Sequence, residues 1–328
     1  MRLSIVTPCY NEAANIEELH RQLALVADQI PGAVEFVFVD DGSRDATLEK
    51  LRQVARDDPR ARVLSLSRNF GHQAALSAGM DFAAGDAVVV MDADLQHPPE
   101  LILKFIEKWQ EGYDLVYAYR EGVPPRMGYR FINALMKVRV PAEAADFRLM
   151  DRRVVDAFRR MPERARFIRG MISWLGFRQI GLGYRQRDRF AGERTYTLRQ
   201  TARMAVNAIL AFSSVPLRVA SVLGLCTLLA GLAYAMYILF AKLAGWYIEP
   251  GWTALMLTVL VLGGVQLLCL GIIAEYIGRI FEEVKQRPLY VVREHIAPPG
   301  VEPESPGMSS QFIACRPGAA AQDAMRTV

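Results

Sequence analysis

The sequence predicts an α/β domain with a mostly parallel central sheet, followed by a two-helix transmembrane hairpin. Short runs rich in β-branched residues alternate with helical patterns through the N-terminal part of the chain, as in βαβ units. Two apolar runs, at residues 219–240 and 252–273, are each about 22 residues long and can cross a bilayer as helices. This combination points to chemistry on a substrate that lives in the membrane.

Four strands are expected at residues 3–7, 35–39, 62–67 and 87–91, with helices around residues 14–28, 46–57 and 73–83 between them. Strands joined through helices pair in parallel, so their carboxyl ends share one edge of the sheet. Ligands of open α/β sheets bind outside that edge. The polar segments that follow the strands therefore predict the site; they are residues 7–12, 40–45 and 92–99.

The two apolar runs contain no charged residue, and length disfavours the alternative of a buried hairpin in a soluble core. Basic residues flank the outer ends of the hairpin, whereas the loop between the runs carries one lysine and one glutamate; the flanking residues are Arg218, Arg279, Lys285 and Arg287. This asymmetry predicts that both termini are cytoplasmic. We expect a cytoplasmic domain at 1–212, the hairpin at 213–277 and a cytoplasmic tail at 278–328 that is disordered after about residue 297.

Two pairs of acids follow the predicted strands. Asp92 and Asp94 are two residues apart at a strand end, so both side chains project to the same face. Such carboxylates repel each other unless a cation lies between them, and Mg²⁺ or Mn²⁺ is bound by one or two carboxylates together with substrate phosphates. Asp-x-Asp alone is equally compatible with a turn. Asp40 and Asp41 also fit a simple Asp-Gly turn, which leaves their adjacency at the sheet edge unexplained.

Several classes of protein are excluded by what the sequence lacks. It has neither the GxGxxG fingerprint of dinucleotide-binding proteins nor the GxxxxGK of P-loop proteins. Between Arg148 and Arg203 there are about 15 arginines against about five acids. No nucleic-acid recognition motif or aromatic stacking series accompanies this basic segment, so we expect no nucleic-acid partner. Its charge also fits a simple role beside anionic lipid.

Five motifs together resemble membrane-anchored family 2 glycosyltransferases of the polyprenyl-phosphate type. This group includes the bactoprenol glucosyltransferases, the undecaprenyl-phosphate aminoarabinose transferases and the dolichol-phosphate mannose synthases. The resemblance covers roughly residues 3 to 290. The motifs are Val6-Thr7-Pro8-Cys9-Tyr10-Asn11-Glu12, Asp40-Asp41-Gly42-Ser43-Arg44-Asp45, Ser67-Arg68-Asn69-Phe70-Gly71-His72-Gln73, Asp92-Ala93-Asp94-Leu95-Gln96-His97-Pro98-Pro99-Glu100 and Asp146-Phe147-Arg148-Leu149-Met150.

The resemblance implies a GT-A fold for the first domain and assigns roles to its residues. It implies nucleotide binding by Pro8, Tyr10, Glu12, Asp40, Asp41 and Asp92. Asp92 and Asp94 would hold Mg²⁺ or Mn²⁺ on the diphosphate, and Gln96 would lie close to the donor sugar. Asp146 would lie where acceptor meets donor, so the catalytic set would be Asp94, Gln96 and Asp146.

Arginines are the expected ligands of the acceptor phosphate or the diphosphate. The resemblance places Arg148 near the acceptor phosphate. Arg148 is also the expected cationic neighbour of Asp146, and a merely local structural pair is the alternative. Arg185, Arg187 and Arg189 are candidate phosphate forks. The following turn departs from the family, which commonly continues with Ser-Lys-Tyr where this chain has Arg194-Thr195-Tyr196. A shifted guanidinium is not equivalent to the ammonium it replaces.

The function implied is inverting transfer of a sugar from a nucleotide diphosphate sugar, with UDP-glucose preferred, to polyprenyl phosphate for modification of a cell-envelope glycan. A phosphate monoester has a second pKa of about 6 and is already an anionic nucleophile at neutral pH. Segments 129–140 and 198–212 are amphipathic and can lie on the membrane or pack in a core. The resemblance implies a multi-pass protein of the bacterial inner membrane that forms a homo-oligomer, and it suggests a tetramer.

Two alternatives differ in class. One is a non-catalytic sugar-nucleotide sensor or membrane scaffold, against which the intact Asp92 and Asp94 argue. The other is a processive polysaccharide synthase. Such enzymes carry Gln-x-x-Arg-Trp and more membrane helices, whereas this chain has Gln186-Arg187-Asp188-Arg189-Phe190 and two spans.

Overall fold

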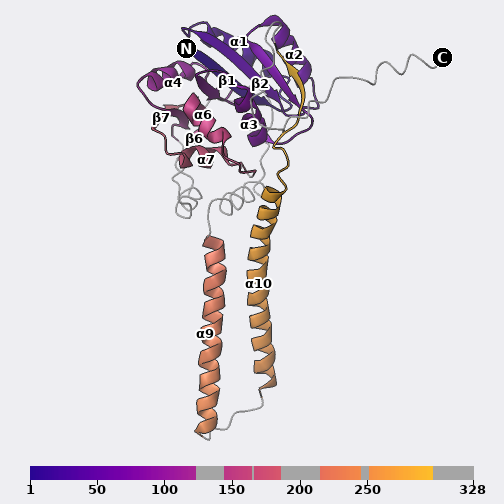
Figure 1. Ribbon diagram of the computed structural model, residues 1–328, viewed down its shortest axis with the longest axis vertical. Coiled ribbons are helices and arrows are strands. Elements are labelled where there is room, and N and C mark those ends of the chain that lie inside the picture. Colours follow the sequence, from indigo (N-terminus) through magenta and orange to yellow (C-terminus); the bar gives the residue numbers. More distant parts are fainter. Residues whose placement is uncertain (123–143, 165, 186–214, 245–250, 298–328) are drawn as a thin grey trace, which may run out of the picture. The chain divides into compact units, whose positions relative to one another are not determined.

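The computed structural model describes residues 1–122, 144–164, 166–185, 215–244 and 251–297. These residues divide into two compact units, one with every strand and one with the two long C-terminal helices (Figure 1). The first unit contains β1 (Arg2–Cys9), α1 (Ile16–Ala27), β2 (Ala33–Asp40), α2 (Thr47–Asp57), β3 (Ala61–Leu66), α3 (His72–Phe82), β4 (Ala87–Val90), α4 (Leu101–Gln110), β5 (Leu115–Arg120), β6 (Ala144–Asp151), α6 (Arg152–Arg159), α7 (Ile168–Trp174), β7 (Gln179–Tyr184) and β8 (Val292–Ile296).

The strands form one eight-stranded mixed sheet in the order β7-β5-β6-β4-β1-β2-β3-β8. The four strands predicted from the sequence are β1 to β4, and they pair in parallel, which confirms the predicted α/β class. β6 runs antiparallel between β4 and β5, and β8 runs antiparallel to β3 at the far edge. Neither of these strands was predicted from the sequence.

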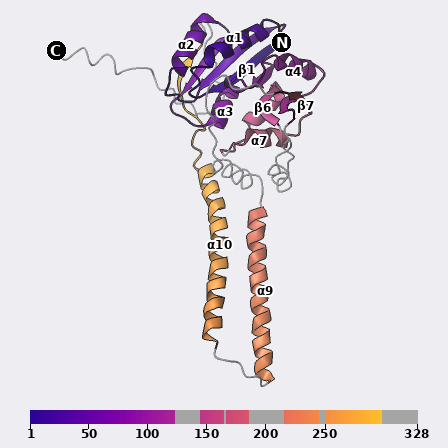
Figure 2. The same cartoon turned by 180° about the vertical axis from the view of Figure 1, so that it is seen from behind.

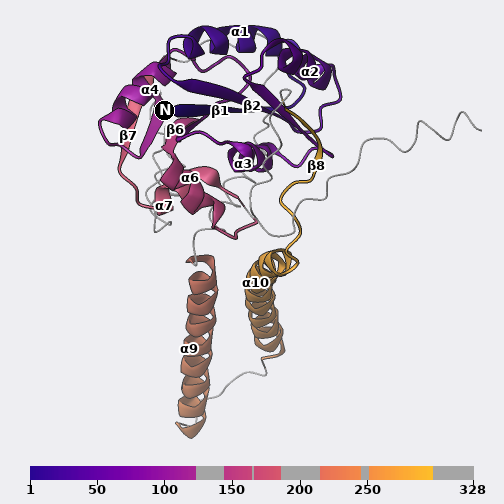
Figure 3. The same cartoon turned by 45° about the horizontal axis from the view of Figure 1, so that its top comes forward.

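Helices cover both faces of this sheet. Figure 3 shows α1, α2 and α4 on one face and α3 and α6 on the other. Buried side chains of β1 and β2, such as Ile5 and Phe36, form one core with the apolar stripes of α1, α2 and α4. On the other face, Gly79 lets α3 approach β1 closely, because a Cβ at this position would clash with the side chain of Val6. Burial on both faces explains why these strands read as nearly continuous apolar runs.

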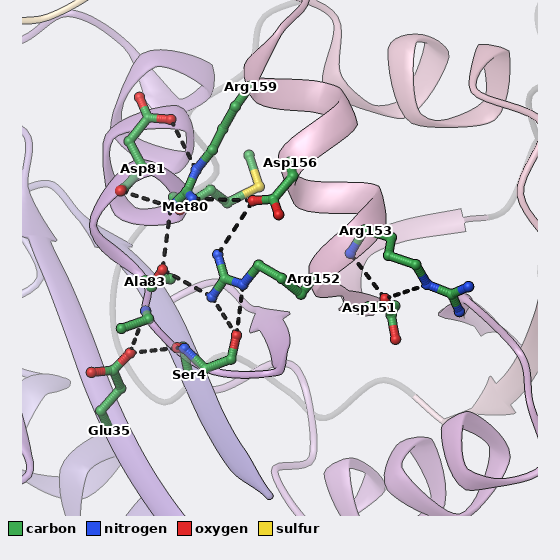
Figure 4. A network of polar contacts seen from close by, with 12 residues as sticks. Ser4, Glu35, Met80, Asp81, Ala83, Asp151, Arg152, Arg153, Asp156 and Arg159 are labelled. Carbon is green, nitrogen blue, oxygen red and sulfur yellow. Dashed lines mark hydrogen bonds and ion pairs between the residues drawn. The ribbon is translucent and has the colours of Figure 1, made fainter. Parts of the chain in front are cut away.

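A polar network fastens α6 to the end of α3 (Figure 4). Arg152 donates to the carbonyl oxygens of Gly85 at 2.8 Å and Ala83 at 2.9 Å, and Arg159 donates to that of Asp81 at 2.7 Å. Helix C-termini leave carbonyl groups without intrahelical partners, and these guanidinium groups satisfy them. The network therefore stabilises the packing of α6 against the core of the domain.

The second unit consists of α9 (Val215–Leu243) and α10 (Trp252–Val284), which lie side by side in both views (Figures 1 and 2). Each contains a window of mean hydropathy 2.0, of which 6% is buried in α9 and none in α10. Helices of this length and composition can cross a membrane, in line with the predicted hairpin. α10 continues 11 residues beyond the predicted end of its span at Ile273, up to Val284. The predicted surface segments 129–140 and 198–212 lie outside the described residues.

Candidate active site

The predicted polar segments converge at the carboxyl edge of the sheet. Parallel pairing aligns Cys9 with Asp40 and Val6 with Val90, so the residues after β1, β2 and β4 share this edge. The antiparallel strand β6 places Arg148 opposite Val90. Two residues further along, this register brings Asp146 of β6 beside Asp92. Strand pairing alone thus gathers residues from four distant parts of the sequence.

The acids at the end of β2 are buried and already hydrogen-bonded. Asp40 accepts from the backbone N–H of Ser43 at 3.0 Å and from the hydroxyl of Ser65 at 3.1 Å. Asp41 accepts from the N–H groups of Phe70 at 2.7 Å and Gly71 at 2.9 Å. Burial raises the pKa of Asp41, although these two hydrogen bonds act in the opposite direction. Both carboxylates therefore shape the loops of this edge, whatever ligand they also face.

The loop after β1 is pinned to the loop after β2. Asn11 has a φ of 55°, and its side-chain oxygen accepts from the N–H of Arg44 at 2.9 Å. The N–H of Glu12 donates to the hydroxyl of Thr47 at 2.9 Å, and the Glu12 carboxylate accepts from Asn15. Pro8 is buried within β1, whereas Tyr10 is 40% exposed at the rim. These contacts hold the first two predicted nucleotide motifs together.

Asp92 carries the clearest sign of a missing ligand. Its Oδ1 is buried and has no hydrogen-bond partner among the described residues; the nearest cationic group there is Nε2 of His72, at 3.5 Å. Nδ1 of the buried His97 lies 3.8 Å from the other oxygen and also lacks a hydrogen bond within these ranges. Burying an unpaired carboxylate oxygen is costly, so this position fits a bound cation or a polar ligand group.

The residues after Asp92 form a tight turn. Leu95 has a φ of 60°, which a branched side chain seldom adopts, and the N–H of Gln96 donates to Asp94 at 3.2 Å. Strain of this kind is often kept where a side chain must be held in place. Within the described ranges, no three His, Cys, Asp or Glu side chains gather as a ready-made metal cage. Asp92 and Asp94 are thus the carboxylates that could hold Mg²⁺ together with phosphate oxygens, as this ion usually binds.

Asp146 lies at the centre of a partly buried charge cluster, and the partner that holds it was not predicted from the sequence. Arg169 of α7 donates from Nε to Oδ1 at 2.7 Å and from Nη2 to Oδ2 at 2.8 Å. Arg148, the neighbour expected from the sequence, is 3.5 Å away, is buried, and donates to the carbonyl of Ala145. The closest cation is thus Arg169, and Arg148 is a more distant second.

The charge cluster shifts the ionisation of its members. Burial would raise the pKa of Asp146, but Arg169 and the other cations around it hold this pKa well below its usual range. Burial lowers the pKa of Arg148 to about 10. Burial also works against protonation of His72, yet Asp146 and Asp92 outweigh it and raise the pKa of His72. Because these cations keep its pKa low, Asp146 carries a negative charge at neutral pH.

A hydrogen bond joins the start of α3 to the start of α7. Gln73 follows His72 at the start of α3, and its side-chain oxygen accepts from the N–H of Ile168 at 3.0 Å, next to Arg169 at the start of α7. The helix starts that carry His72 and Arg169 are therefore fixed to each other. This link positions both cations around Asp146.

The arginines predicted to bind phosphate are only partly described. β5 and β7 are parallel and end at Arg120 and Tyr184, whose side chains meet at 3.5 Å on the same edge of the sheet. Arg185 follows as an exposed residue. Arg187 and Arg189 lie outside the described residues. Arg120 was not among the predicted residues, because nothing local distinguishes one arginine at a strand end from the many others.

Comparison with known proteins identifies the family of the chain. Residues 4–158 match the family model of glycosyl transferase family 2, and residues 215–280 match that of the GtrB C-terminal hairpin. An uncharacterized glycosyltransferase of Bacillus subtilis, YkcC, is 43% identical over 90% of this chain and 94% of its own length. The bactoprenol glucosyl transferase from prophage SfII of Shigella flexneri is 37% identical over 90% of this chain and 98% of its own.

Solved structures show the same type of fold. The mannosyl-3-phosphoglycerate synthase from Rubrobacter xylanophilus aligns with a TM-score of 0.50 at 20% identity, over 64% of this chain and 72% of that one. The catalytic unit is a GT-A domain, as the resemblance predicted. The chain belongs to glycosyl transferase family 2, and its C-terminal hairpin associates it with membranes.

Proposed function

We propose that the protein transfers a hexose from a nucleotide diphosphate sugar to polyprenyl phosphate at the membrane surface, with inversion of the anomeric carbon. The observation that carries this proposal is the meeting of Asp92 and Asp146 around His72 at one edge of the sheet, with Asp94 two residues after Asp92, in a chain with an apolar hairpin. The names of its relatives support the same acceptor class, since several are bactoprenol glucosyl transferases. The proposed boundaries are a catalytic domain at 1–212, a hairpin at 213–277 and a tail at 278–328.

The proposed donor is UDP-glucose, held by the loops after β1 and β2. Pro8, Tyr10, Glu12, Asp40 and Asp41 would surround the nucleoside. Asp92 and Asp94 would hold Mg²⁺ or Mn²⁺, which when bound supplies positive charge to the leaving diphosphate. The buried, unbonded oxygen of Asp92 supports this assignment, because it leaves a position for such an ion. Gln96 would lie next to the donor sugar.

The proposed acceptor needs no strong base. Its phosphate monoester has a second pKa of about 6, so at neutral pH an anionic oxygen can attack the anomeric carbon directly. Asp146, kept ionised by Arg169, would fix the surrounding cations rather than accept a proton. One displacement on the face opposite the leaving group turns an α-linked donor into a β-linked lipid phosphate. Arg120 and Arg185, with Arg187 and Arg189, would bind phosphate; buried Arg148 would act through Asp146.

The proposed setting is the bacterial inner membrane. Both termini would be cytoplasmic, with α9 and α10 as two spans and the basic flanks of the hairpin on the cytoplasmic side. The chain would form a homo-oligomer, with a tetramer as the proposed state, through its hairpin. In this setting the active site would work at the surface where polyprenyl phosphate presents its head group.

A transfer assay tests the function. Purified protein in detergent receives radiolabelled UDP-glucose, UDP-GlcNAc or GDP-mannose, with undecaprenyl phosphate and Mg²⁺ or Mn²⁺. Label should enter the lipid phase from one donor, in the presence of metal, and not with Asp94→Ala. A folded protein that binds nucleotide but forms no lipid product with any donor would contradict the proposal and favour a sensor.

A further inference from the structure

The segment that follows the hairpin returns to the catalytic domain and becomes part of its sheet. β8 pairs with β3, and the N–H of Ser67 donates to the carbonyl of Val291 at 2.9 Å. Tyr290 is buried and donates to Asp81 at 2.7 Å, and Arg52 of α2 pairs with Glu294 at 2.6 Å. We call residues 287–296 the return segment. It contacts β3, α2 and α3 of the catalytic domain.

Arg293 occupies an irregular position in this segment. Ser65 of β3 pairs with Glu294, whereas the next residue, Leu66, pairs with Val292, so Arg293 is the extra residue of a β-bulge. A bulge redirects the side chain of the inserted residue and is common near active sites. Here the guanidinium donates from Nη2 to the hydroxyl oxygen of Ser65 at 2.9 Å. The bulge therefore directs a cation of the return segment at a buried residue of β3.

The direction of this hydrogen-bond chain is fixed by the donors available. Arginine can only donate, so the Ser65 oxygen accepts from Arg293 and its single proton goes to Asp40, 3.1 Å away. Ser65 and Asp40 are fully buried. The other oxygen of Asp40 accepts from the N–H of Ser43 at 3.0 Å, in the loop after β2. Arg293 thus orients the acid at the proposed nucleotide end of the site.

A second connection supports the neighbouring acid. The bond from Ser67 to Val291 anchors the start of the loop that follows β3. Two N–H groups later in the same loop, those of Phe70 and Gly71, hold both oxygens of Asp41. The return segment is therefore connected to both acids at the end of β2 by independent routes.

We propose that Arg293, through Ser65, is a positioning residue for Asp40, so that the segment after the membrane hairpin fixes the nucleoside-binding end of the catalytic domain. The inference rests on the proposed function, because it takes Asp40 to face the nucleotide. Arg293 does not touch substrate. Its loss should weaken nucleotide binding and leave the chemical step unchanged.

Calorimetric titration of the full-length protein in detergent with UDP, and with GDP in parallel, tests this. Arg293→Ala and Ser65→Ala should each raise the dissociation constant of the nucleotide about 3- to 10-fold, the effect of one hydrogen bond. The double variant should be no weaker than the worse single one, because both break one chain. Arg293→Lys should recover part of the affinity. Arg52→Ala, the matched control, breaks a surface pair of the same segment and should bind as the wild type does.

Kinetics separate positioning from a general loss of structure. Arg293→Ala should raise KM for the donor, with kcat and the KM for the acceptor within about twofold of the wild type. The inference would be overturned if Arg293→Ala bound the nucleotide as tightly as the wild type does. It would also be overturned if the fold-changes in dissociation constant of the two single variants multiplied in the double variant. If instead the wild type binds neither nucleotide, the proposed function itself fails, and this inference with it.

Discussion

Removal of the Arg169 guanidinium should destabilise the catalytic domain substantially. Breaking a buried ion pair from one side costs about 3–5 kcal/mol, because the remaining charge is left uncompensated. Asp146 is 12% exposed and has both oxygens bound by Arg169. In the variant, Arg148 at 3.5 Å and His72 at 3.6 Å from Asp146 still offset its charge. The expected loss of stability is therefore about 3 kcal/mol, the lower end of that range. At about 2–4 °C per kcal/mol for a domain of this size, Arg169→Ala should lower Tm by about 6–12 °C.

Thermal unfolding followed by intrinsic fluorescence, in one detergent and at one protein concentration, measures this shift. The double variant Asp146→Asn with Arg169→Gln removes both charges and keeps groups that can hydrogen-bond. It should regain only part of the lost Tm, because Arg148 and His72 also lose their charged neighbour. Transfer activity should stay low, since the fixed charge at Asp146 is gone. An Arg169→Ala protein that melts within about 2 °C of the wild type would refute the reasoning, since the pair would then contribute little.

Three further changes have defined outcomes. Gly42→Ala should weaken UDP binding in a titration, because its Cβ would lie 2.5 Å from the carbonyl carbon of Arg68 at a φ of +66°. Tyr290→Phe should lower Tm by an amount equivalent to about 1.5–3 kcal/mol, since it removes a hydrogen bond to a partly buried carboxylate. Asp58 has a pKa lowered to about 2: burial opposes the shift, but hydrogen bonds from Arg60 outweigh it. Ionised Asp58 therefore stabilises the fold above its unfolded pKa of about 4. In urea unfolding, Asp58→Asn should lower the free energy of unfolding by about 2 kcal/mol at pH 7, and by progressively less as the pH falls toward 2.

The elements that could be predicted from the sequence are those marked by a pattern within a short stretch of the chain. The strands β1 to β4 are short apolar runs between helical patterns, and the acids at their ends were found because parallel pairing gathers strand ends at one edge. Five motifs in order then implied the GT-A fold, which the family match confirms. In both cases the decisive information lay within a few residues along the chain.

The partner of Asp146 could not be found in that way. Arg169 is 23 residues further along and lies among many arginines with the same local appearance. The choice between Arg169 and Arg148 is made by the packing of α7 against α3, through Gln73 and Ile168. No periodicity or spacing records that contact.

β8 was missed for a related reason. It is five residues long, follows a membrane helix, and pairs with a strand more than 200 positions earlier. The bond from Arg293 to Ser65 spans 228 residues. This part of the chain was predicted to be a tail, since a short strand at a sheet edge has little apolar periodicity of its own.

The anomeric configuration of the lipid product is the most direct test of the account. The wild-type protein is supplied with UDP-α-glucose, undecaprenyl phosphate and Mg²⁺, and the product is examined by NMR for the coupling constant of its anomeric proton. A single displacement by the acceptor phosphate predicts a β-linked lipid phosphate. An α-linked product would contradict the mechanism, and transfer of glucose to water alone would contradict the proposed acceptor.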